Sequence, residues 1–419
     1  MIFKSFKYRL YPNVAQQEQM MKTFGCKRLV FNQLLDTQIK RYESGDKNLT
    51  YFGCNSLIVE WKNEQNTTFL AEVDSQALQQ AAKDLHDAYT NFFKSITGKR
   101  KGPKINSPKF KSKYSRQSYR TPNNNGTIKF KDNSFRLPTL GYVKAAIDRQ
   151  PEGKIKSATI SMDRDRKFYV SVLVETEQKL LSMTGKEVGI DLGIKDLFVT
   201  SDGSRFTNPK DLIRMTKTTQ RIKSLQKKLA RTRKGSKNRE KIRIKLASAY
   251  KRLTNQRNSY YHELSHWLVN SYDAIYAEDL NVKGMMANRK LSRVIHESSW
   301  STLVGMIKYK CEWYGKTFYQ INRFYPSSKT CSCCNHKIEK LTLNDREWEC
   351  PSCGTIHDRD NNAAINVLKQ GQKDLYNTSL VRHEAGNIVI IPTALQKLNN
   401  KIERSDSLKS VIQRSELVN

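Results

Sequence analysis

The sequence predicts a mixed α/β chain with a small metal-binding module in its C-terminal half. Three observations support this fold class. Apolar residues alternate in short stretches typical of strands, they recur at helical spacing in longer stretches, and five of the eight cysteines fall between Cys331 and Cys353. With 419 residues, the chain is long enough for several domains.

The composition points to a polyanionic partner. The net charge is +34 and the sequence pI is near 9.8, which opposes compaction unless the charge is neutralised. Long nucleic acid is the natural partner, because each neutralised phosphate releases a counterion. A structural RNA binder of the ribosomal type is the alternative that composition leaves open. The chain begins without an apolar signal segment and has no run of about 18 apolar residues, so we expect a cytoplasmic protein with no membrane span.

The N-terminal third predicts a strand followed by a helical domain. Phe6, Tyr8 and Leu10 alternate with basic residues, as in a half-buried strand. Asn13 and Gln16 form a capping-box pattern, so a helix should begin near Val14. A second helix is expected over residues 75–96, and residues 97–120 are basic with interleaved aromatic rings, typical of nucleic-acid contact or of a solvated linker.

Two hairpins are predicted after this region. Residues 154–176 alternate as a β-hairpin, so a β-module that includes the first strand, with the helical domain inserted, is expected. Residues 212–253 carry two apolar stripes separated by a turn at 234–236, which predicts a helical hairpin. Its exposed positions are almost all Lys or Arg, so we expect this face to lie along a nucleic-acid duplex. The chain after Gln370 is polar and predicts a weakly ordered tail.

The clustered cysteines predict a structural zinc ribbon. Cys331, Cys334, Cys350 and Cys353 form two C-x2-C pairs that bracket a loop of fifteen residues. Each pair can aim two thiolates at one tetrahedral Zn²⁺, and four thiolates leave no open position for catalysis. Cys333 is a competing ligand. His336 and His357 are substitute ligands.

Three acids occur where buried segments end. Asp191 follows an apolar run and is flanked by Gly189 and Gly193, which would let a backbone approach closely. Glu278 ends a second apolar run, and Asp360 lies near the start of a helix, where it is either an N-cap or a metal ligand. Carboxylates converging from different elements can hold two Mg²⁺ ions for phosphodiester hydrolysis.

The chain resembles the TnpB family, encoded in small bacterial insertion sequences and related to type V CRISPR effectors. Five motifs carry the resemblance in order: GIDLG at 189–193, AEDL at 277–280, PSSKTCSCC at 326–334, REWECPSCG at 346–354 and HDRDNNAAIN at 357–366. The segments RLYPN, PKFKSK and SYRT extend it over roughly residues 1–370. The first knuckle departs from the usual C-x2-C-G pattern, because Asn335 replaces glycine.

The resemblance implies a domain organisation. It implies a β-barrel wedge domain (1–12 and 121–184) with an inserted helical recognition domain and basic linker (13–120). It also implies an RNase H-like (RuvC) nuclease core (185–326 and 357–375) interrupted by the zinc ribbon (327–356), and residues 376–419 remain as the tail.

The resemblance also implies an activity. The chain would be an RNA-guided endonuclease that cuts double-stranded DNA beside a short transposon-adjacent motif, with a guide RNA from the transposon end and a monomeric protein in the ribonucleoprotein. Asp191, Glu278 and Asp360 would be the catalytic Mg²⁺ ligands, with Asp358 as the near neighbour of Asp360. The motif-reading surface would involve Tyr51, Ser75, Gln79, Thr121 and Asn123.

Three other classes of function would leave different signs in the sequence. An RNA-guided repressor of the same family would have lost one or more catalytic acids, whereas all three are present here. A zinc-ribbon DNA-binding regulator would not require the acids. A transposase for single-strand transposition would carry an HUH motif, and the sequence shows none.

Overall fold

The computed structural model describes residues 1–100, 102–124, 126–342 and 345–384. The chain divides into two compact units, Met1–Glu177 and Gln178–Asn419. Each is described by itself below. None of the helices in the described part of the chain is long and apolar enough to cross a membrane.

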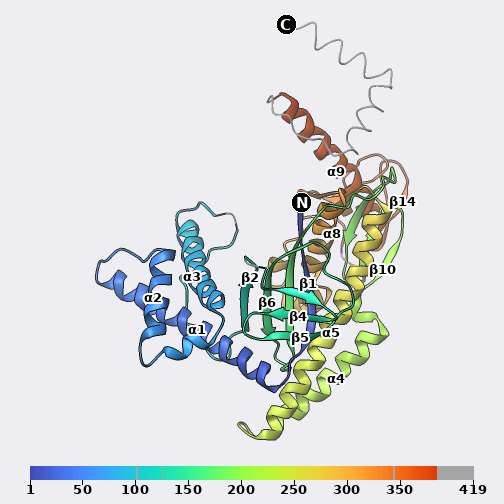
Figure 1. Cartoon of the computed structure of the whole chain (residues 1–419). Coiled ribbons are helices and arrows are strands. Elements are labelled where there is room, and N and C mark those ends of the chain that lie inside the picture. Colours follow the sequence, from blue (N-terminus) through green and yellow to red (C-terminus); the bar gives the residue numbers. More distant parts are fainter. Residues whose placement is uncertain (101, 125, 343–344, 385–419) are drawn as a thin grey trace. The chain divides into compact units, whose positions relative to one another are not determined.

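The N-terminal unit combines an antiparallel sheet with three helices that lie between its first two strands in the sequence (Figure 1). The strand order is β2-β6-β7-β1-β5-β4-β3. The strands are β1 (Ile2–Tyr11), β2 (Gln117–Pro122), β3 (Lys129–Lys131), β4 (Ser134–Leu137), β5 (Gly141–Ala146), β6 (Lys154–Met162) and β7 (Phe168–Thr176). The helices are α1 (Val14–Glu43), α2 (Tyr51–Asn63), η1 (Thr68–Glu72) and α3 (Ser75–Ile96).

Most of the predicted elements of this unit are confirmed. Helix α1 begins at Val14 behind a complete capping box of Asn13 and Gln16, and α3 covers the predicted 75–96. The hairpin predicted over 154–176 is β6 and β7. The expected boundary at 120 is wrong in detail, because β2 begins at Gln117, within the segment taken as linker. The closed β-barrel stays a prediction.

The C-terminal unit is built around a five-stranded mixed sheet. Its order is β10-β9-β8-β11-β12, in which β8 pairs antiparallel with β9 and parallel with β11. The strands are β8 (Glu187–Leu192), β9 (Asp196–Thr200), β10 (Arg205–Thr207), β11 (Ala274–Glu278) and β12 (Thr317–Ile321). The helices are η2 (Pro209–Asp211), α4 (Ile213–Ala230), α5 (Lys237–Ser271), α6 (Val282–Met285), α7 (Arg289–Ser298), α8 (Trp300–Tyr314), η3 (Ser327–Lys329) and α9 (Arg359–Glu384).

Alternation along the central strands separates the two faces of this sheet. Val188 and Ile190 of β8, with Ile275 of β11, belong to a core formed with Leu268 of α5 and Ile307 of α8. The residues between them, including Ala274 and Tyr276, face the other way and pack with Val367 of α9. Because successive side chains of a strand point to opposite faces, the odd-numbered positions of β8 and even-numbered positions of β11 lie beneath α9.

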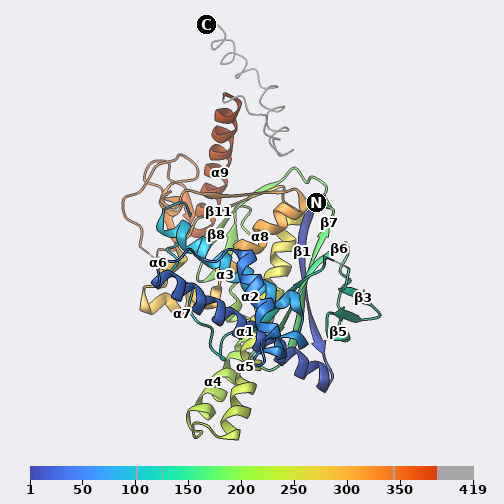
Figure 2. The ribbon, with the colours of Figure 1, turned by 60° about the vertical axis from the view of Figure 1, so that its left-hand side comes forward.

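Helices α4 and α5 form the predicted helical hairpin (Figure 2). Its predicted end at 253 is too early, because α5 continues to Ser271. The additional turns bury Tyr261 and Leu264 against the sheet.

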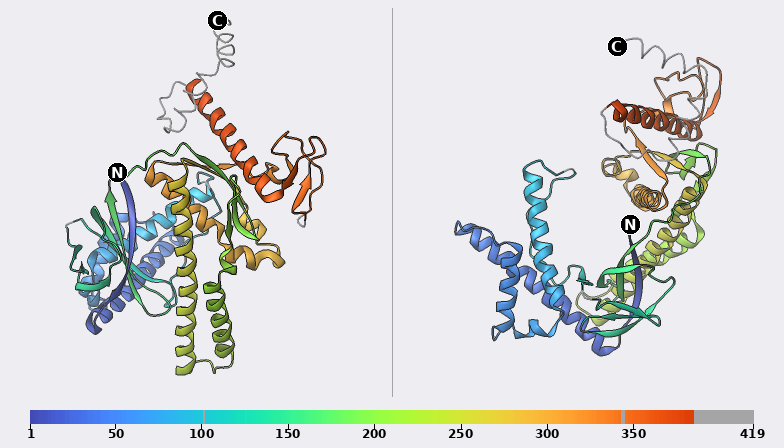
Figure 3. Two further views of the ribbon diagram at one scale, coloured as in Figure 1. Left: turned by 90° about the vertical axis from the view of Figure 1, so that its right-hand side faces the viewer. Right: turned by 45° about the horizontal axis from the view of Figure 1, so that its top comes forward.

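The predicted ribbon is a two-stranded hairpin of β13 (Glu347–Glu349) and β14 (Ile356–Asp358), and α9 begins directly after it (Figure 3). Helix α9 runs to Glu384, past the boundary predicted at 375, so the expected tail does not begin at 376. The rest of that expected tail, residues 385–419, lies outside the described residues.

Candidate active site and metal centre

Asp191 and Glu278 lie on adjacent parallel strands and on the same face of the sheet. Asp191 is in β8 and Glu278 ends β11, where the preceding pair is Ala277 opposite Ile190. Both positions alternate with residues buried in the α5–α8 core, so both carboxylates point toward α9. Asp360 is in the first turn of α9. The structure therefore gathers the three predicted acids around one end of this helix.

Two glycines let α9 approach the sheet closely. A Cβ atom on Gly189 would lie 2.2 Å from the backbone oxygen of Ala364 and 2.6 Å from the backbone nitrogen of Leu368. A Cβ atom on Gly371 of α9 would lie 2.2 Å from the ring of Tyr276. The close backbone approach predicted at Gly189 is thus confirmed, and it fixes the height of Asp360 above β8.

The three carboxylates interact electrostatically. Burial raises the pKa of Asp191 well above its usual value, and the neighbouring charges of Glu278 and Asp360 raise it further. Burial also raises the pKa of Glu278, while a hydrogen bond from the hydroxyl of Ser327 opposes that rise. Crowded carboxylates of this kind are costly without a cation, so the donor set fits a hard divalent ion such as Mg²⁺.

Asp358 and Asp360 have different surroundings. One oxygen of Asp358 accepts a hydrogen bond from the backbone N–H of Asn361 at 2.9 Å and lies 2.7 Å from the guanidinium of Arg205. Asp360 has looser contacts, 3.5 Å from Arg346 and 3.9 Å from Arg205, and its charge acts on Asp191. Asp358 therefore serves as a helix cap, which favours Asp360 as the third acid.

Among the described residues, the three acids do not form a tight cluster of ligand atoms. Within the described part of the chain, the groups of three or more candidate ligands whose donor atoms all lie within 4.8 Å of one another consist of cysteines and His357. A pair of cations about 4 Å apart can bridge carboxylates at a wider spacing than a single ion.

The four predicted zinc ligands converge. The sulfurs of Cys331, Cys334, Cys350 and Cys353 all lie within 4.8 Å of one another, and the Cys331–Cys353 and Cys334–Cys350 sulfur pairs are each 3.6 Å apart. A tetrahedron with Zn–S bonds of about 2.3 Å places its sulfurs about 3.8 Å apart. The spacing of these two sulfur pairs is therefore compatible with a tetrahedral zinc ion.

The unusual Asn335 keeps the knuckle geometry. Asn335 has φ of 62°, and Gly354, at the corresponding position of the second knuckle, has φ of 69°. In each knuckle this residue donates its backbone N–H to the carbonyl of the first cysteine, at 3.0 Å and 2.8 Å respectively. Asparagine is among the few residues that tolerate the left-handed region, so the substitution leaves the turn intact.

The alternative ligands are placed differently. Cys331, Cys333 and His357 form a second possible group, and the Nε2 atom of His357 lies 3.0 Å from the Cys331 sulfur. The buried His357 also packs against Trp348, with 4.7 Å between ring centroids and the rings tilted by 40°. His336 is exposed and belongs to neither group. The four-cysteine set has the more complete coordination, with His357 positioned to hydrogen-bond one of its sulfurs.

The suggested motif-reading residues all lie in the N-terminal unit. Tyr51 begins α2, and Ser75 and the exposed Gln79 lie one turn apart on α3. Thr121 is buried and its hydroxyl donates to Asp74, while Asn123 bonds backbone atoms of Ile128 and Ile155. The last two side chains already have internal partners. The role of all five in reading DNA stays a prediction.

Sequence reasoning missed the polar residues that connect the ribbon to the acids. Asn362 and Asn366, one turn apart on α9, both donate to the carbonyl of Thr330, at 2.8 Å and 2.6 Å. Asn366 also bonds the carbonyl of Ser327, whose hydroxyl contacts Glu278. The N-x-x-x-N spacing within HDRDNNAAIN was a visible signal, since residues four apart share a helix face.

Three family models match separate parts of the chain. They are described as "Helix-turn-helix domain" at residues 1–47, "Probable transposase" at 169–289 and "Cas12f1-like, TNB domain" at 300–367. The first segment folds here as a strand and one long helix, β1 and α1. The last one spans α8, the ribbon and the start of α9.

Relatives match nearly the whole chain. A Streptomyces pristinaespiralis protein named "Putative RNA-guided DNA endonuclease" is 37% identical over 377 residues, covering 88% of this chain and 89% of the relative. The Escherichia coli K12 protein "Putative RNA-guided DNA endonuclease InsQ" is 29% identical over 386 residues, covering 88% and 92%. Relatives named "TnpB-like protein" occur in Acanthamoeba polyphaga mimivirus, with 28% identity over 400 residues for one of them.

A solved structure supports the fold. The structure described as "the mini-RNA-guided endonuclease CRISPR-Cas_phi3" matches with a TM-score of 0.51 and 8% sequence identity, covering 88% of this chain and 92% of that one. At such low identity the likeness concerns the fold alone.

Proposed function

Because the chain belongs to the TnpB family, we propose that it is an RNA-guided endonuclease that cuts double-stranded DNA at an RNase H-like, RuvC-type site. The observation that carries this proposal is the placement of Asp191, Glu278 and Asp360 around the end of α9. The alternative function, a non-cleaving RNA-guided repressor, gains no support, since Asp191 and Glu278 share one face of the sheet and Asp360 is on the helix that packs on that face.

The residues of the site would have distinct roles. Asp191, Glu278 and Asp360 would hold two Mg²⁺ ions, which supply an activated water and stabilise the leaving 3′ oxygen. Ser327 orients Glu278 through its hydroxyl, and Arg205 holds Asp358 at the start of α9. Glycine at 189 sets the distance between α9 and β8. The four cysteines would hold Zn²⁺ as a structural ion, since the site leaves no open coordination position.

The remaining parts of the chain fit the domains of such a nuclease. We assign the antiparallel sheet of the N-terminal unit to a wedge domain and α1–α3, inserted between β1 and β2, to a recognition domain that reads a short motif beside the target. The basic surfaces of residues 97–120 and of α4 and α5 would bind the guide RNA from the transposon end and its duplex with DNA. We propose one protein per ribonucleoprotein, acting in the bacterial cytoplasm, where thiols stay reduced and free for zinc.

The test is guided cleavage of plasmid DNA by the purified ribonucleoprotein. Asp191→Ala should abolish strand cleavage while leaving binding of RNA and target DNA unchanged, because those contacts are made by basic surfaces. Glu278→Ala should behave alike. EDTA should stop cleavage, and Mg²⁺ or Mn²⁺ should restore it. Cutting by Asp191→Ala at the wild-type rate would leave a guided binding protein.

Asp358 and Asp360 provide a matched comparison two residues apart. Asp360→Ala should remove cleavage, whereas Asp358→Ala should retain most of it, because Asp358 acts as a cap and contacts Arg205. Loss of a cap costs about 1 kcal/mol of stability, which thermal unfolding can measure. Equal loss of cleavage in both variants would remove the distinction between these acids.

A further inference from the structure

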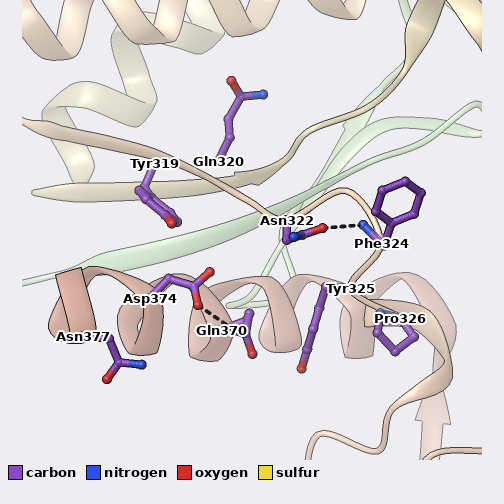
Figure 4. Close-up of a pocket in the computed structure, with 9 residues that line it drawn as sticks. All are labelled: Tyr319, Gln320, Asn322, Phe324, Tyr325, Pro326, Gln370, Asp374 and Asn377. Carbon is purple, nitrogen blue, oxygen red and sulfur yellow. Dashed lines mark hydrogen bonds between the residues drawn. The ribbon is translucent and has the colours of Figure 1, made fainter.

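An open cavity of about 800 Å³ lies between β12 with its following loop and the middle of α9 (Figure 4). Among the described residues that line it, none is basic and Asp374 is the one charged side chain. In a chain of net charge +34, a cavity without lysine or arginine does not suit a phosphate. Its other walls are aromatic rings and side-chain amides.

The cavity is joined to the nuclease site through Glu278. In the parallel pairing of β11 with β12, Ile321 lies opposite Glu278, and the loop that follows β12 lines the cavity. That loop returns at Ser327, whose hydroxyl contacts the Glu278 carboxylate. Arg323 also pairs with Asp279 at 2.6 Å. The loop wall of the cavity, which ends at Pro326, is therefore one residue from the Glu278 contact, whereas its helix wall begins at Gln370, about 15 Å along α9 from Asp360.

The loop holds an aromatic ring in solvent. Phe324 is 87% exposed, yet its backbone is fixed: its N–H donates to the side-chain oxygen of Asn322 at 2.9 Å, and the N–H of Tyr325 donates to the carbonyl of Asn322 at 3.1 Å (Figure 4). Tyr325, by contrast, packs partly against the core beneath α9. Because this loop is already ordered, stacking of a base on the exposed phenyl ring would cost the protein little conformational entropy.

Opposite the loop, α9 contributes hydrogen-bonding groups. Gln370 and Asp374 are bonded to each other at 2.7 Å, and Asn377 lies one turn farther along the helix (Figure 4). Amide side chains have donors and acceptors that match the edges of nucleobases. An aromatic ring on which a base can stack, together with amides that can bond its edge, is suited to recognising an unpaired base.

We infer that this cavity, the base pocket, binds one or two unpaired nucleobases of the DNA strand that is being cut, with Phe324 stacking on one of them. The inference rests on the proposed nuclease function. It adds a positioning site: the pocket would hold the single strand so that its backbone crosses the carboxylates. No covalent step occurs in the pocket itself.

The first test is cleavage by the guide-loaded, full-length protein. Phe324→Ala should lower the single-turnover cleavage rate roughly 5-fold to 150-fold, the range expected for loss of one stacked base. Target binding and the unfolding temperature should not change, because Phe324 is exposed. Phe324→Tyr should cut like the wild type. Phe324→Leu, which keeps apolar bulk without a ring face, should resemble Phe324→Ala; wild-type cutting by both would overturn the inference.

The second test locates the base. In the Asp191→Ala background, which keeps the DNA uncut, 2-aminopurine is moved base by base along the target strand on both sides of the cut. One or two adjacent positions should show quenching that Phe324→Ala removes. A free single-stranded DNA oligonucleotide that carries the same probe tests base binding without the guide RNA.

The outcomes separate the two proposals. Phe324-dependent quenching of the free oligonucleotide supports the base pocket even where guided binding fails, which would count against the proposed function alone. Guided binding with no Phe324-dependent position in either arm overturns the base pocket and leaves the nuclease intact. Quenching confined to RNA oligonucleotides would also overturn the assignment to DNA.

Discussion

Replacing Gly189 by alanine should shift α9 away from the sheet and slow cleavage strongly without unfolding the protein. The new Cβ would lie 2.2 Å from the backbone oxygen of Ala364, whereas ordinary contact begins at 3.4 Å. Neither partner is a flexible side chain, so α9 must move by about 1.2 Å or β8 must bend. Asp360 is one turn before Ala364 and would move with the helix.

The size of the effect follows from two general magnitudes. Overpacking of a close-packed interior costs about 1–3 kcal/mol, so the variant should unfold a few degrees earlier but still fold. A misplacement of about 1 Å at a catalytic centre costs on the order of 100-fold in rate. Single-turnover cleavage should therefore fall about 100-fold, while binding of guide RNA and target DNA persists.

Gly305 provides the matched control. It lies in α8 of the same unit, and a Cβ atom there would meet nothing within 4 Å. Gly305→Ala should therefore raise stability by up to about 1 kcal/mol through helix propensity alone and leave cleavage unchanged. If Gly189→Ala cut DNA at the wild-type rate with an unchanged unfolding temperature, the argument that this contact sets the position of Asp360 would be refuted.

Further predictions concern the metal and one buried ion pair. Cys350→Ser should lose zinc by elemental analysis and lower the unfolding temperature of the ribbon, whereas Cys333→Ser should keep about one zinc per chain; the reverse pattern would assign the site to Cys333. Asp273→Asn should cost about 3–5 kcal/mol at pH 7, because it leaves the buried Lys316 ammonium, 2.6 Å away, without its counter-charge. Burial would raise the pKa of Asp273, but hydrogen bonds from Lys316 and two backbone N–H groups hold it below its usual value. The stabilisation from the ionised Asp273 is then present above the pKa of the unfolded state, about 3.9, and is lost as pH falls through the lower pKa of the folded state. The difference in free energy of unfolding between wild type and variant, from urea melts, should therefore narrow only below about pH 4. A gap that is constant down to pH 2 would contradict this account.

Much of the fold could be predicted because the signals were local. The capping box of Asn13 and Gln16 marks the start of α1, and the alternation over 154–176 marks β6 and β7. Helix α2 was missed, since the sequence over 51–63 lacks a clear apolar stripe and its burial depends on contacts with distant residues such as Leu70 and Leu85. The strands β3 and β4 were missed because, with three and four residues, each is too brief to show alternation on its own.

The acids of the candidate site could be predicted from the sequence, but the residues that position these acids could not. Asp191 and Glu278 end apolar runs, so their placement at neighbouring strand ends follows from alternation and parallel pairing. Ser327, by contrast, touches Glu278 from a segment nearly fifty residues later in the chain, and Arg205 reaches Asp358 from the β9–β10 hairpin. Contacts at such separation depend on how the elements pack, which no local pattern reveals.

Hydrogen bonds connect the predicted zinc ribbon to the three acids of the proposed nuclease site. The carbonyl of Thr330, next to the ligand Cys331, accepts hydrogen bonds from Asn362 and Asn366 of α9, the helix whose first turn carries Asp360. Ser327, three residues earlier, contacts Glu278. Because two of the three acids are thus held by the segment entering the first knuckle, loss of zinc should slow cleavage through misplaced carboxylates rather than through lost DNA binding. The insertion of a structural metal module between β12 and α9 therefore has a physical reason: it fixes the end of the helix on which the last acid depends.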